Sequence, residues 1–283
     1  PPIRRRRTDS WQTQHRTTPR TRRRKTGARR KQFIPLMPRN HSRQPENELH
    51  GALLIDKPAG PTSHDIVDII RGQYGLQKVG HCGTLDPAAT GLLILLLGRA
   101  TKLSMKLTAD HKIYEGSIEF GKCTDSYDAQ GDITATAAVP SLDCEALNAA
   151  AQSFQGDIQQ KPPMVSAVKK DGVPLYKLAR KGKTIEREAK PVHIFSFEFN
   201  QYTASVGTFR VHCSKGTYVR SLAHELGEQL GCGAHLRTLN RTASGKFDVA
   251  DAIRLEDLVK LPEAELPGRV LSLVELAHLL QPE

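Results

Sequence analysis

The 283-residue sequence predicts an α+β fold, and three observations lead to this prediction. Runs typical of β-strands and runs with helical spacing both occur along the chain. They follow one another in an irregular order, which favours a mixed α+β domain over a doubly wound α/β domain. No segment recurs at a fixed period, so a repeat array is not indicated.

The first part of the predicted domain begins near His50. GALLIDK at 51–57 predicts a strand that ends at a Pro-Gly turn, and a short amphipathic helix follows with Ser63 as its N-cap. TGLLILLLG at 90–98 predicts a buried segment, TKLSMKLTAD at 101–110 a helix, and HKIYEGSIEFG at 111–121 a strand. CTDSYDAQGD at 123–132 is polar and rich in turn residues, and therefore predicts a loop.

The second part has a predicted helix over 143–155, interrupted afterwards by QQKPP, and a further helix through PLYKLARKG at 174–182. Two strand-like runs follow at 191–198 and 203–213. GTYVRSLAHELGEQLG at 216–231 predicts a strand that turns into a helix, closed by Gly231 and Gly233.

The formal net charge of +11 is concentrated in the first 50 residues, which hold 15 Lys or Arg and three acidic residues. The remainder has 26 basic and 27 acidic residues, so the total charge says little about the folded part. Residues 1–48 predict a disordered, Arg-rich extension. Three interpretations stay open: an RNA-binding arm, an organelle transit segment, or translated sequence upstream of the true start. The lack of Met at position 1 favours the last two, with Met37 as an alternative start.

Several classes of protein are disfavoured. The longest apolar run, 92–97, is far shorter than the roughly 20 residues of a membrane helix. The five cysteines never form CxxC, which argues against a disulfide framework and a structural zinc site and indicates a reducing cytoplasm. His81 stands where a phosphate loop needs Lys, and Glu228 stands where a zinc-protease helix needs its second His. Residues 81–82 and 212–213 are each a His-Cys pair. Their spacing does not require the two pairs to meet as metal ligands, so no metal is expected.

The stretch GHCGTLDPAATG at 80–91 places one acidic residue, Asp86, among glycines and a proline. Glycines permit positive φ and Pro87 biases Asp86 towards an extended conformation, so Asp86 is expected on a shaped loop. From these residues alone, a cap on a turn or helix opened by Pro87 is the favoured interpretation. A catalytic carboxylate is the other.

Two further residues are candidates for chemistry with Asp86. In CSKGTYVRS at 213–221, Arg220 could pair with a carboxylate and keep it ionised, or could belong to an edge strand. Tyr114 in KIYEG could stack on a planar base, although a strand tyrosine more often packs in a core. The spacing leaves both choices open.

Five motifs together resemble the TruB family of tRNA pseudouridine synthases and occur in the family's order over nearly all of residues 50–255. They are GALLIDKPAGPTSHD, VGHCGTLDPAATGLLILLLGRATK, KIYEGSIEFGKCTDSYDAQGD, KPPMVSAVKKDGVPLYKLARKG and VHCSKGTYVRSLAHELG. The resemblance implies a pseudouridine synthase fold, with a twisted, mainly antiparallel mixed sheet, flanking helices and a central catalytic cleft. It also implies an isomerase that detaches uracil from N1, rotates it and reattaches it through C5, with no metal or organic cofactor.

The resemblance also assigns roles to particular residues. Asp86 matches the family's nucleophile, attacking C6 of the base or C1′ of the ribose, and Arg220 matches its arginine partner. Tyr114 matches the ring that stacks on the target base and can help to remove the C5 proton. The residues expected to bind substrate are Lys57, His81 and Leu236. Residues 122–165 would form a mobile insertion that closes on the RNA.

The implied substrate is the T-loop uridine of tRNA, position 55, on the T-arm stem-loop, modified by a cytoplasmic enzyme that acts as a monomer without an obligate protein partner. The catalytic domain is expected over 49–255. Residues 256–283 are expected as a short C-terminal segment without a complete PUA domain. Two alternatives stay open: a tRNA-folding chaperone without catalysis, and a relative that acts on another RNA or within a guide-RNA complex.

Overall fold

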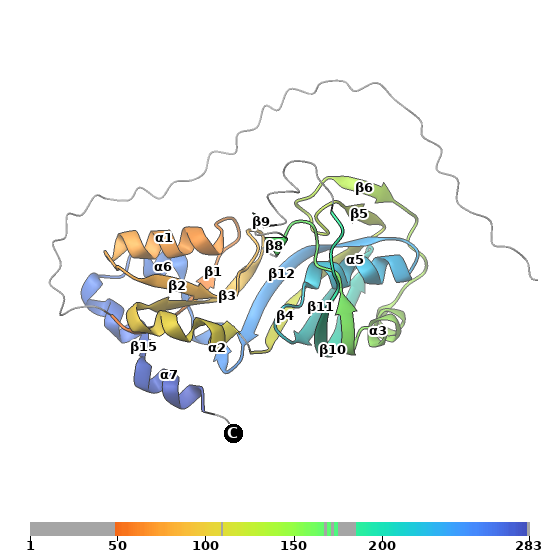
Figure 1. Cartoon of the computed structure of the whole chain (residues 1–283). Coiled ribbons are helices and arrows are strands. Elements are labelled where there is room, and N and C mark those ends of the chain that lie inside the picture. The colour runs from red at the N-terminus through yellow and green to blue at the C-terminus, as the bar shows by residue number, and fades with distance from the viewer. Residues whose placement is uncertain (1–48, 109, 167–168, 171–172, 175–184, 282–283) are drawn as a thin grey trace, which may run out of the picture. The chain divides into compact units, whose positions relative to one another are not determined.

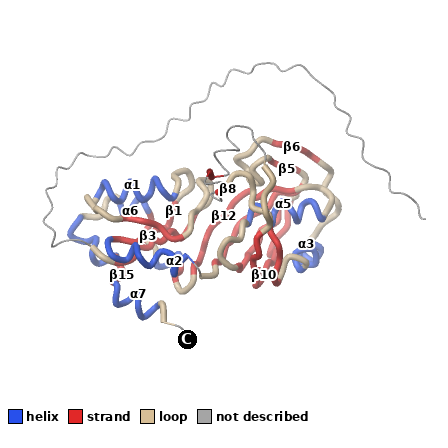
Figure 2. Tube along the Cα trace, in the orientation of Figure 1, coloured by secondary structure: helices blue, strands red, loops and turns tan. Residues whose placement is uncertain are grey.

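The computed structural model describes residues 49–108, 110–166, 169–170, 173–174 and 185–281. The predicted extension 1–48 lies outside this range, and so does most of the predicted helix 174–182. The main sheet follows the order β14-β1-β3-β12-β4-β11-β10-β7, with β2 on β3, β13 on β12 and β15 on β1. Among the strand pairs of this sheet, β1 with β14 and β3 with β12 are parallel and the others are antiparallel. This mixed, mainly antiparallel sheet with flanking helices confirms the predicted α+β class (Figures 1 and 2).

The strands and helices have the following bounds. The main-sheet strands are β1 (Gly51–Lys57), β2 (Val79–Cys82), β3 (Thr90–Leu97), β4 (Lys112–Phe120), β7 (Gly156–Gln160), β10 (Lys190–Thr203), β11 (Val206–Cys213), β12 (Ala234–Ser244), β13 (Phe247–Asp248), β14 (Ile253–Arg254) and β15 (Val270–Ser272). Two small hairpins are formed by β5 (Lys122–Thr124) with β6 (Ile133–Thr136) and by β8 (Lys169–Lys170) with β9 (Val173–Pro174). The helices are α1 (Ser63–Gln73), α2 (Ser104–Thr108), α3 (Cys144–Gln152), α5 (Val219–Gln229), α6 (Leu255–Leu258) and α7 (Leu273–Leu279), with 3₁₀ turns η2 (Gly98–Leu103), η3 (Val249–Asp251) and η4 (Glu263–Arg269).

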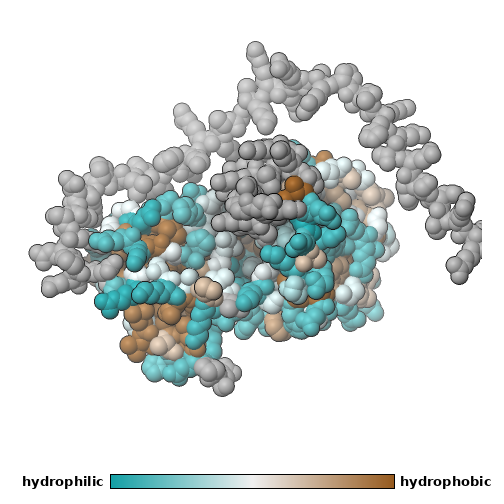
Figure 3. All heavy atoms as spheres, in the orientation of Figure 1, coloured by the Kyte–Doolittle hydropathy of each residue, from teal (hydrophilic) through white to brown (hydrophobic). Residues whose placement is uncertain are grey.

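The sheet is covered differently at its two ends. Around β1 and β3, alternate residues such as Leu53 and Leu54 belong to two separate cores, one shared with α1 and α6 and the other with α2 and α7. A strand that is buried on both faces has no solvent side, which explains the uninterrupted apolar run of β3. In β11 only alternate residues are buried, and Phe209 and Val211 join the core on the side of α5. Figure 3 shows hydrophilic residues over much of the visible surface, with hydrophobic residues gathered around α7.

Strand β12 joins the two halves of the sheet. It pairs with β4 from Ala234 to Ser244, but its parallel pairing with β3 is limited to Asn240 and Arg241. β12 therefore connects the half of the sheet that contains β1 and β3 to the half that contains β4, β11 and β10.

Gly91 lies at this narrow contact, and its missing side chain allows the two strands to approach. Its φ is +96°, and a Cβ there would lie 2.3 Å from the Arg241 carbonyl oxygen. We expect Gly91→Ala to lower the free energy of unfolding by roughly 3 kcal/mol, because backbone strain and a backbone clash act together. Gly156→Ala is the matched control, since Gly156 has φ +83° with nothing within 4 Å of a Cβ, and should cost about 1 kcal/mol. Urea unfolding of both variants checks this, and equal losses would contradict it.

Most of the predicted elements are confirmed, including the strand at 51–57, the buried segment at 90–98, the strand at 111–121 and the helix within 143–155. The strands at 191–198 and 203–213 are confirmed within β10 and β11, and β10 is longer than expected. The predicted loop 123–132 contains the last residues of β5, which pairs with β6.

Three local predictions were wrong. The N-cap of α1 is Thr62 rather than Ser63, because Thr62 and Asp65 form a reciprocal capping box with bonds of 2.9 and 3.0 Å. The helix predicted over 101–110 is divided into η2 and α2. The strand predicted at the start of 216–231 is absent from the described structure there, because the chain turns at Gly216, with φ +83°, and α5 begins at Val219.

The C-terminal residues pack against the edge of β1. β14 pairs with Ile55 and Asp56, β15 pairs with residues 51–53, and α7 lies against the second core through Leu276. Among the described residues, no helix is long and apolar enough to cross a membrane.

Candidate active site

A cavity of about 260 Å³ lies beside β4 and β12. Its lining comes from the loop after β2, the end of α2, the start of β4, Ser166, the segment that leads from β11 into α5, and the middle of β12. The lining residues are Gly83, Thr84, Leu85, Asp86, Thr108, Lys112, Tyr114, Ser166, residues 214–220, Leu239 and Arg241. Three candidates from the sequence, Asp86, Tyr114 and Arg220, therefore meet in one cavity although they are far apart in the chain.

Side chains from β1 and α1 hold the loop that carries Asp86 through hydrogen bonds to its backbone. Ser63 exchanges two hydrogen bonds with the backbone of Leu85, at 2.9 and 3.2 Å. The buried ammonium group of Lys57 donates to the carbonyl oxygens of Pro87 at 3.3 Å and Ala89 at 2.7 Å. These bonds fix the loop backbone on both sides of Asp86. Lys57 is not among the lining residues of the cavity, so its observed contacts are with the loop.

We expect Lys57→Met to lower the free energy of unfolding by roughly 3 kcal/mol, because buried carbonyl groups lose a charged donor. Burial lowers the pKa of Lys57 to about 8, with Arg241 adding to the decrease and Asp86 opposing it. Because the pKa of Lys57 in the folded protein lies below its ordinary value of 10.5, the unfolded chain binds more protons between pH 8 and 10.5, and the wild type gains stability as the pH rises through this range. Urea unfolding at pH 7 and pH 9.5 should therefore show a larger loss for the variant at the higher pH. Lys78→Met, at an exposed lysine, is the control and should change stability by less than about 0.5 kcal/mol.

Arg220 holds Asp86 through an ion pair and a hydrogen bond. Its Nε lies 2.9 Å from Oδ2 of Asp86 and its Nη2 donates to Oδ1 at 3.2 Å. The guanidinium is 3% exposed and the Asp86 side chain is 39% exposed, so the arginine is buried behind a carboxylate that faces the cavity. Pro87 opens a turn, in which the amide of Ala89 donates to the carbonyl oxygen of Asp86 at 3.1 Å, but no helix begins there, and the Asp86 carboxylate pairs with Arg220.

The 124–132 loop completes the surroundings of Arg220. Nη1 of Arg220 lies 3.6 Å from Oδ2 of Asp128 and donates to the carbonyl oxygen of Ser126 at 3.1 Å. Tyr127, between them, has φ +64° and stacks on His224 with ring centroids 3.8 Å apart. A positive φ at a bulky residue is uncommon and stores strain, which is typical of functional loops. This loop therefore supplies Arg220 with a carbonyl acceptor and a second carboxylate.

Burial raises the pKa of Asp86 above its ordinary value of 3.8, and the nearby Asp128 carboxylate adds to this increase. Arg220 and Lys57 oppose it through their positive charges. The expectation that Arg220 favours the ionised carboxylate is thus correct in sign, but burial has the larger effect. A buried carboxylate with weakened solvation is a better nucleophile than one in water, provided that the pH exceeds its pKa.

Tyr114 extends from β4 to the same cavity and is 9% exposed. Burial raises its pKa, and the positive charge of Arg241 opposes that increase. Lys112, two residues earlier on the same strand, also lines the cavity and donates to the carbonyl oxygen of Thr108 at 2.8 Å.

The remaining candidates lie outside the lining of the cavity. His81 is on β2, opposite Leu95 of β3, and its partly buried ring has a lowered pKa because of burial. Leu236 is buried in β12 and its backbone bonds to Tyr127 and Ala129 of the 124–132 loop. Leu239, three residues further along β12, is the leucine of this strand that lines the cavity. The substrate-binding roles of His81 and Leu236 stay predictions.

Sequence reasoning missed Asp128, Lys112, Leu239 and Arg241 as site residues. Asp128 stood in a polar loop whose carboxylates are interchangeable in sequence, and only the fold shows which one meets Arg220. Arg241 belongs to NRTAS, a run with no turn or periodic signal. Its pairing with Tyr114 across β12 and β4 depends on the strand register, which a single sequence does not give.

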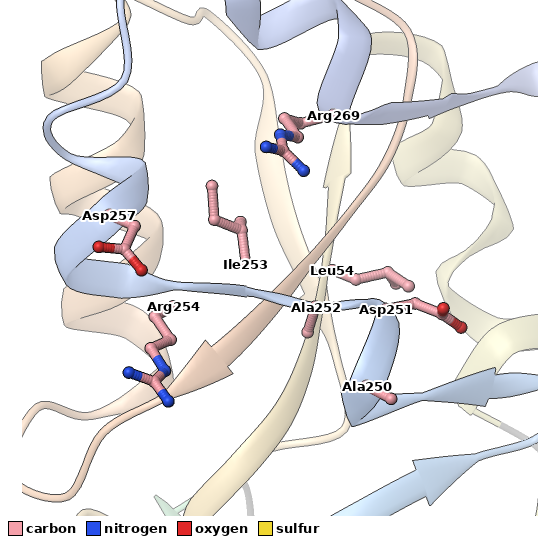
Figure 4. Close-up of a pocket in the computed structure, with 8 residues that line it drawn as sticks. All are labelled: Leu54, Ala250, Asp251, Ala252, Ile253, Arg254, Asp257 and Arg269. Carbon is pink, nitrogen blue, oxygen red and sulfur yellow. The ribbon is translucent and has the colours of Figure 1, made fainter.

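A second hollow, of about 320 Å³, lies at the edge of β1 in the gap between β14 and β15 (Figure 4). Its charged side chains are exposed and balanced, two arginines and two aspartates: Arg254, Arg269, Asp251 and Asp257. It contains none of the catalytic candidates. The cavity around Asp86 is therefore the candidate active site.

Comparison with solved structures identifies the class of protein. The Cbf5–Nop10–Gar1 complex contains a similar chain, with a TM-score of 0.64 and 29% sequence identity. The match covers 81% of this chain and 62% of that chain, so this chain spans less than two thirds of its length. Together with the family model and the relatives described next, this fold identifies the chain as a pseudouridine synthase, an isomerase.

Sequence comparison then gives the family. Residues 71–219 match the TruB family pseudouridylate synthase N-terminal domain, and residues 220–282 match the tRNA pseudouridylate synthase B C-terminal domain. The tRNA pseudouridine synthase B of Opitutus terrae is 50% identical over 234 residues, which cover 83% of this chain and 97% of the relative. That of Syntrophotalea carbinolica is 45% identical over 227 residues, covering 80% and 74%. The chain belongs to the TruB family.

Proposed function

We propose that this chain converts the T-loop uridine of tRNA, position 55, to pseudouridine, with Asp86 as the nucleophile. The observation that carries the proposal is the Asp86 carboxylate, held at 2.9 Å by a buried arginine and facing a cavity of about 260 Å³. A carboxylate can form a covalent bond to the substrate and leave again, so it can serve both halves of the reaction.

The uridine must leave the stacked T-loop to reach this carboxylate, at a cost of a few kcal/mol. Asp86 then attacks either C6 of the base or C1′ of the ribose, the bond between N1 and C1′ breaks, and the uracil rotates. C5 bonds to C1′ and gives up its proton, for which Tyr114 is the acceptor that we propose. His81 would occupy part of the space that the base vacates, and the 122–165 insertion would close over the RNA.

The rest of the site keeps the carboxylate in place. Arg220 aligns Asp86 through two contacts and offsets part of the cost of burying its charge. Lys57 holds the Asp86 loop through backbone carbonyl groups, which makes it a positioning residue. No part of this scheme needs a protein partner, and we propose that the chain acts alone, in the cytoplasm, on the T-arm of tRNA.

The direct test is to incubate the purified protein with an unmodified tRNA transcript and map pseudouridine by carbodiimide-stop sequencing. The expected result is one new stop in the T-loop at position 55. An isolated T-arm stem-loop should be modified as well, without any guide RNA. A stop elsewhere in the tRNA would reject the T-loop assignment, and a requirement for a guide RNA would favour the guided alternative.

The second candidate function, a tRNA chaperone without catalysis, is separated by the same assay. A chaperone would bind tRNA tightly and leave no stop at any uridine. Filter binding of the same transcript, measured alongside, distinguishes that outcome from a protein that does not bind tRNA.

A further inference from the structure

We propose that Arg241 is a positioning residue for the reaction, which fixes the Tyr114 phenol relative to the loop that carries Asp86. The inference rests on the proposed function. It begins from the burial of Arg241, which is 1% exposed and is the largest of the fully buried side chains among the described residues. Burying an arginine is costly, so its surroundings should show what its charge does.

The first observation is that Arg241 is bonded to the backbone on the Asp86 side of the cavity. Its Nε donates to the carbonyl oxygen of Leu92 at 2.8 Å, and its Nη2 donates to that of Gly83 at 3.1 Å. A Cβ at Gly83 would lie 3.1 Å from Nη1, so the loop passes directly over the guanidinium. Gly83 is three residues before Asp86.

The second observation is that Arg241 also meets Tyr114. The two residues are paired in register between β12 and β4, which places their side chains on the same face of the sheet, and both line the cavity. Arg241 is thus bonded to the Asp86 loop and lies beside the Tyr114 ring. Because the planar guanidinium holds several N–H donors in fixed directions, this one side chain can set the distance between the Asp86 loop and the Tyr114 ring.

The third observation is that its charge is not neutralised by a neighbouring carboxylate. In the part of the chain that the structure describes, Arg220 pairs with Asp86 and Asp128, whereas Arg241 forms no ion pair. The groups that act electrostatically on Tyr114 are Arg241 from β12, Cys213 from β11 and Asp86 from its loop, and Arg241 is the cation among them. Its free charge favours the phenolate form of Tyr114, against the effect of burial.

The chemical consequence concerns the C5 proton. When C5 has bonded to C1′, its C–H bond breaks, the electron pair returns to the ring, and the proton bonds to the phenolate oxygen of Tyr114. Arg241 does not touch the substrate in this step. It acts by making the phenolate accessible and by holding it at a set position relative to Asp86.

The test compares Arg241→Gln, which removes the charge, with Arg241→Lys, which keeps it. Arg237→Gln is the matched control, since Arg237 is an exposed arginine on the same strand. The pKa of Tyr114 is measured without RNA, by NMR of protein labelled with ¹³C at tyrosine Cζ, with the resonance assigned through Tyr114→Phe. We expect Arg241→Gln to raise this pKa by roughly 1, and Arg241→Lys and Arg237→Gln to leave it within about 0.3.

Kinetics with tRNA provide the second readout. Arg241→Gln should lower kcat about tenfold with KM changed less than about twofold, and Arg241→Lys should recover most of the loss. In the Tyr114→Phe background, Arg241→Gln should cause little further loss, because its effect passes through the phenol. An unchanged Tyr114 pKa in Arg241→Gln, or losses that multiply in the double variant, would overturn the proposal.

If Arg241→Gln does not fold, as judged by near-UV circular dichroism, Arg241→Lys decides alone. It keeps the charge but lacks the planar guanidinium, so the Tyr114 pKa should stay near that of the wild type while kcat falls only about threefold. An unchanged kcat, or a shifted pKa, would reject the proposal. The NMR titration needs no RNA and therefore tests the coupling between Arg241 and Tyr114 by itself. A wild-type protein without activity on tRNA would reject the proposed function, and the titration would still decide whether the coupling exists.

Discussion

Asp86→Asn is expected to abolish pseudouridine formation, with a fall in kcat of more than about 10⁴-fold, because an amide cannot form and release the covalent bond that we propose. The side chain keeps its shape and can still accept from Arg220, so the fold and tRNA affinity should be retained. Single-turnover kinetics with tRNA, followed by carbodiimide-stop sequencing, measures the loss.

Asp68→Asn provides the matched control for this experiment. Asp68 is an exposed aspartate on α1 that pairs with Arg71 at 2.6 Å, and its amide variant should keep wild-type kcat. If Asp86→Asn retained more than about one hundredth of the wild-type rate, the nucleophile would have to be another group.

Replacement of Arg220 is expected to have the next largest effect. Arg220→Met leaves Asp86 and Asp128 as two neighbouring carboxylates without a cation, and also leaves the carbonyl oxygens of Ser126 and Val165 without their donor. We expect kcat to fall by about 10³-fold and the free energy of unfolding by about 3 kcal/mol, the lower end of the range for a broken buried ion pair, since Asp86 keeps some solvent contact.

The pH profile separates the two contributions of Arg220. In the wild type the reaction should be lost as the pH falls through the pKa of Asp86, which is above 3.8. Arg220→Met removes a charge that lowers this pKa, so the acidic limb of the kcat profile should move to higher pH. Arg220→Lys should keep the limb near its wild-type position and lower kcat through lost alignment alone. An acidic limb that stays in place in Arg220→Met would contradict the pairing as a determinant of reactivity.

The sequence was sufficient for the residues whose role is carried by their local motif. Asp86 was predicted on a shaped loop from Gly83 and Pro87, and the structure places it there with Arg220 as its partner. The buried segment at 90–98 was predicted because its sequence is uniformly apolar, and the structure shows that it is a strand, β3, buried on both faces. The strand-like run at 203–213 contains β11, which buries alternate residues.

Other features could not be predicted, since they depend on contacts between distant segments. Asp128 reaches Arg220 because Asp128 forms an isolated bridge with Leu236, which brings the loop to β12. Arg241 meets Tyr114 only in the register that places β12 beside β4. The N-cap of α1 was misplaced by one residue because Thr62 and Ser63 are both good caps, and the choice depends on Ser63 bonding to Leu85 instead.

The way in which β1 is covered also affects how the protein behaves at high concentration. A long, free strand edge offers unpaired amide and carbonyl groups that can recruit a strand from another molecule. Here β14 contributes two residues and β15 three, and they pair with β1 in opposite directions. No single incoming strand can align along an edge divided in this way. The division therefore protects this end of the sheet against intermolecular β-aggregation, even though its interior strands are among the most apolar in the chain.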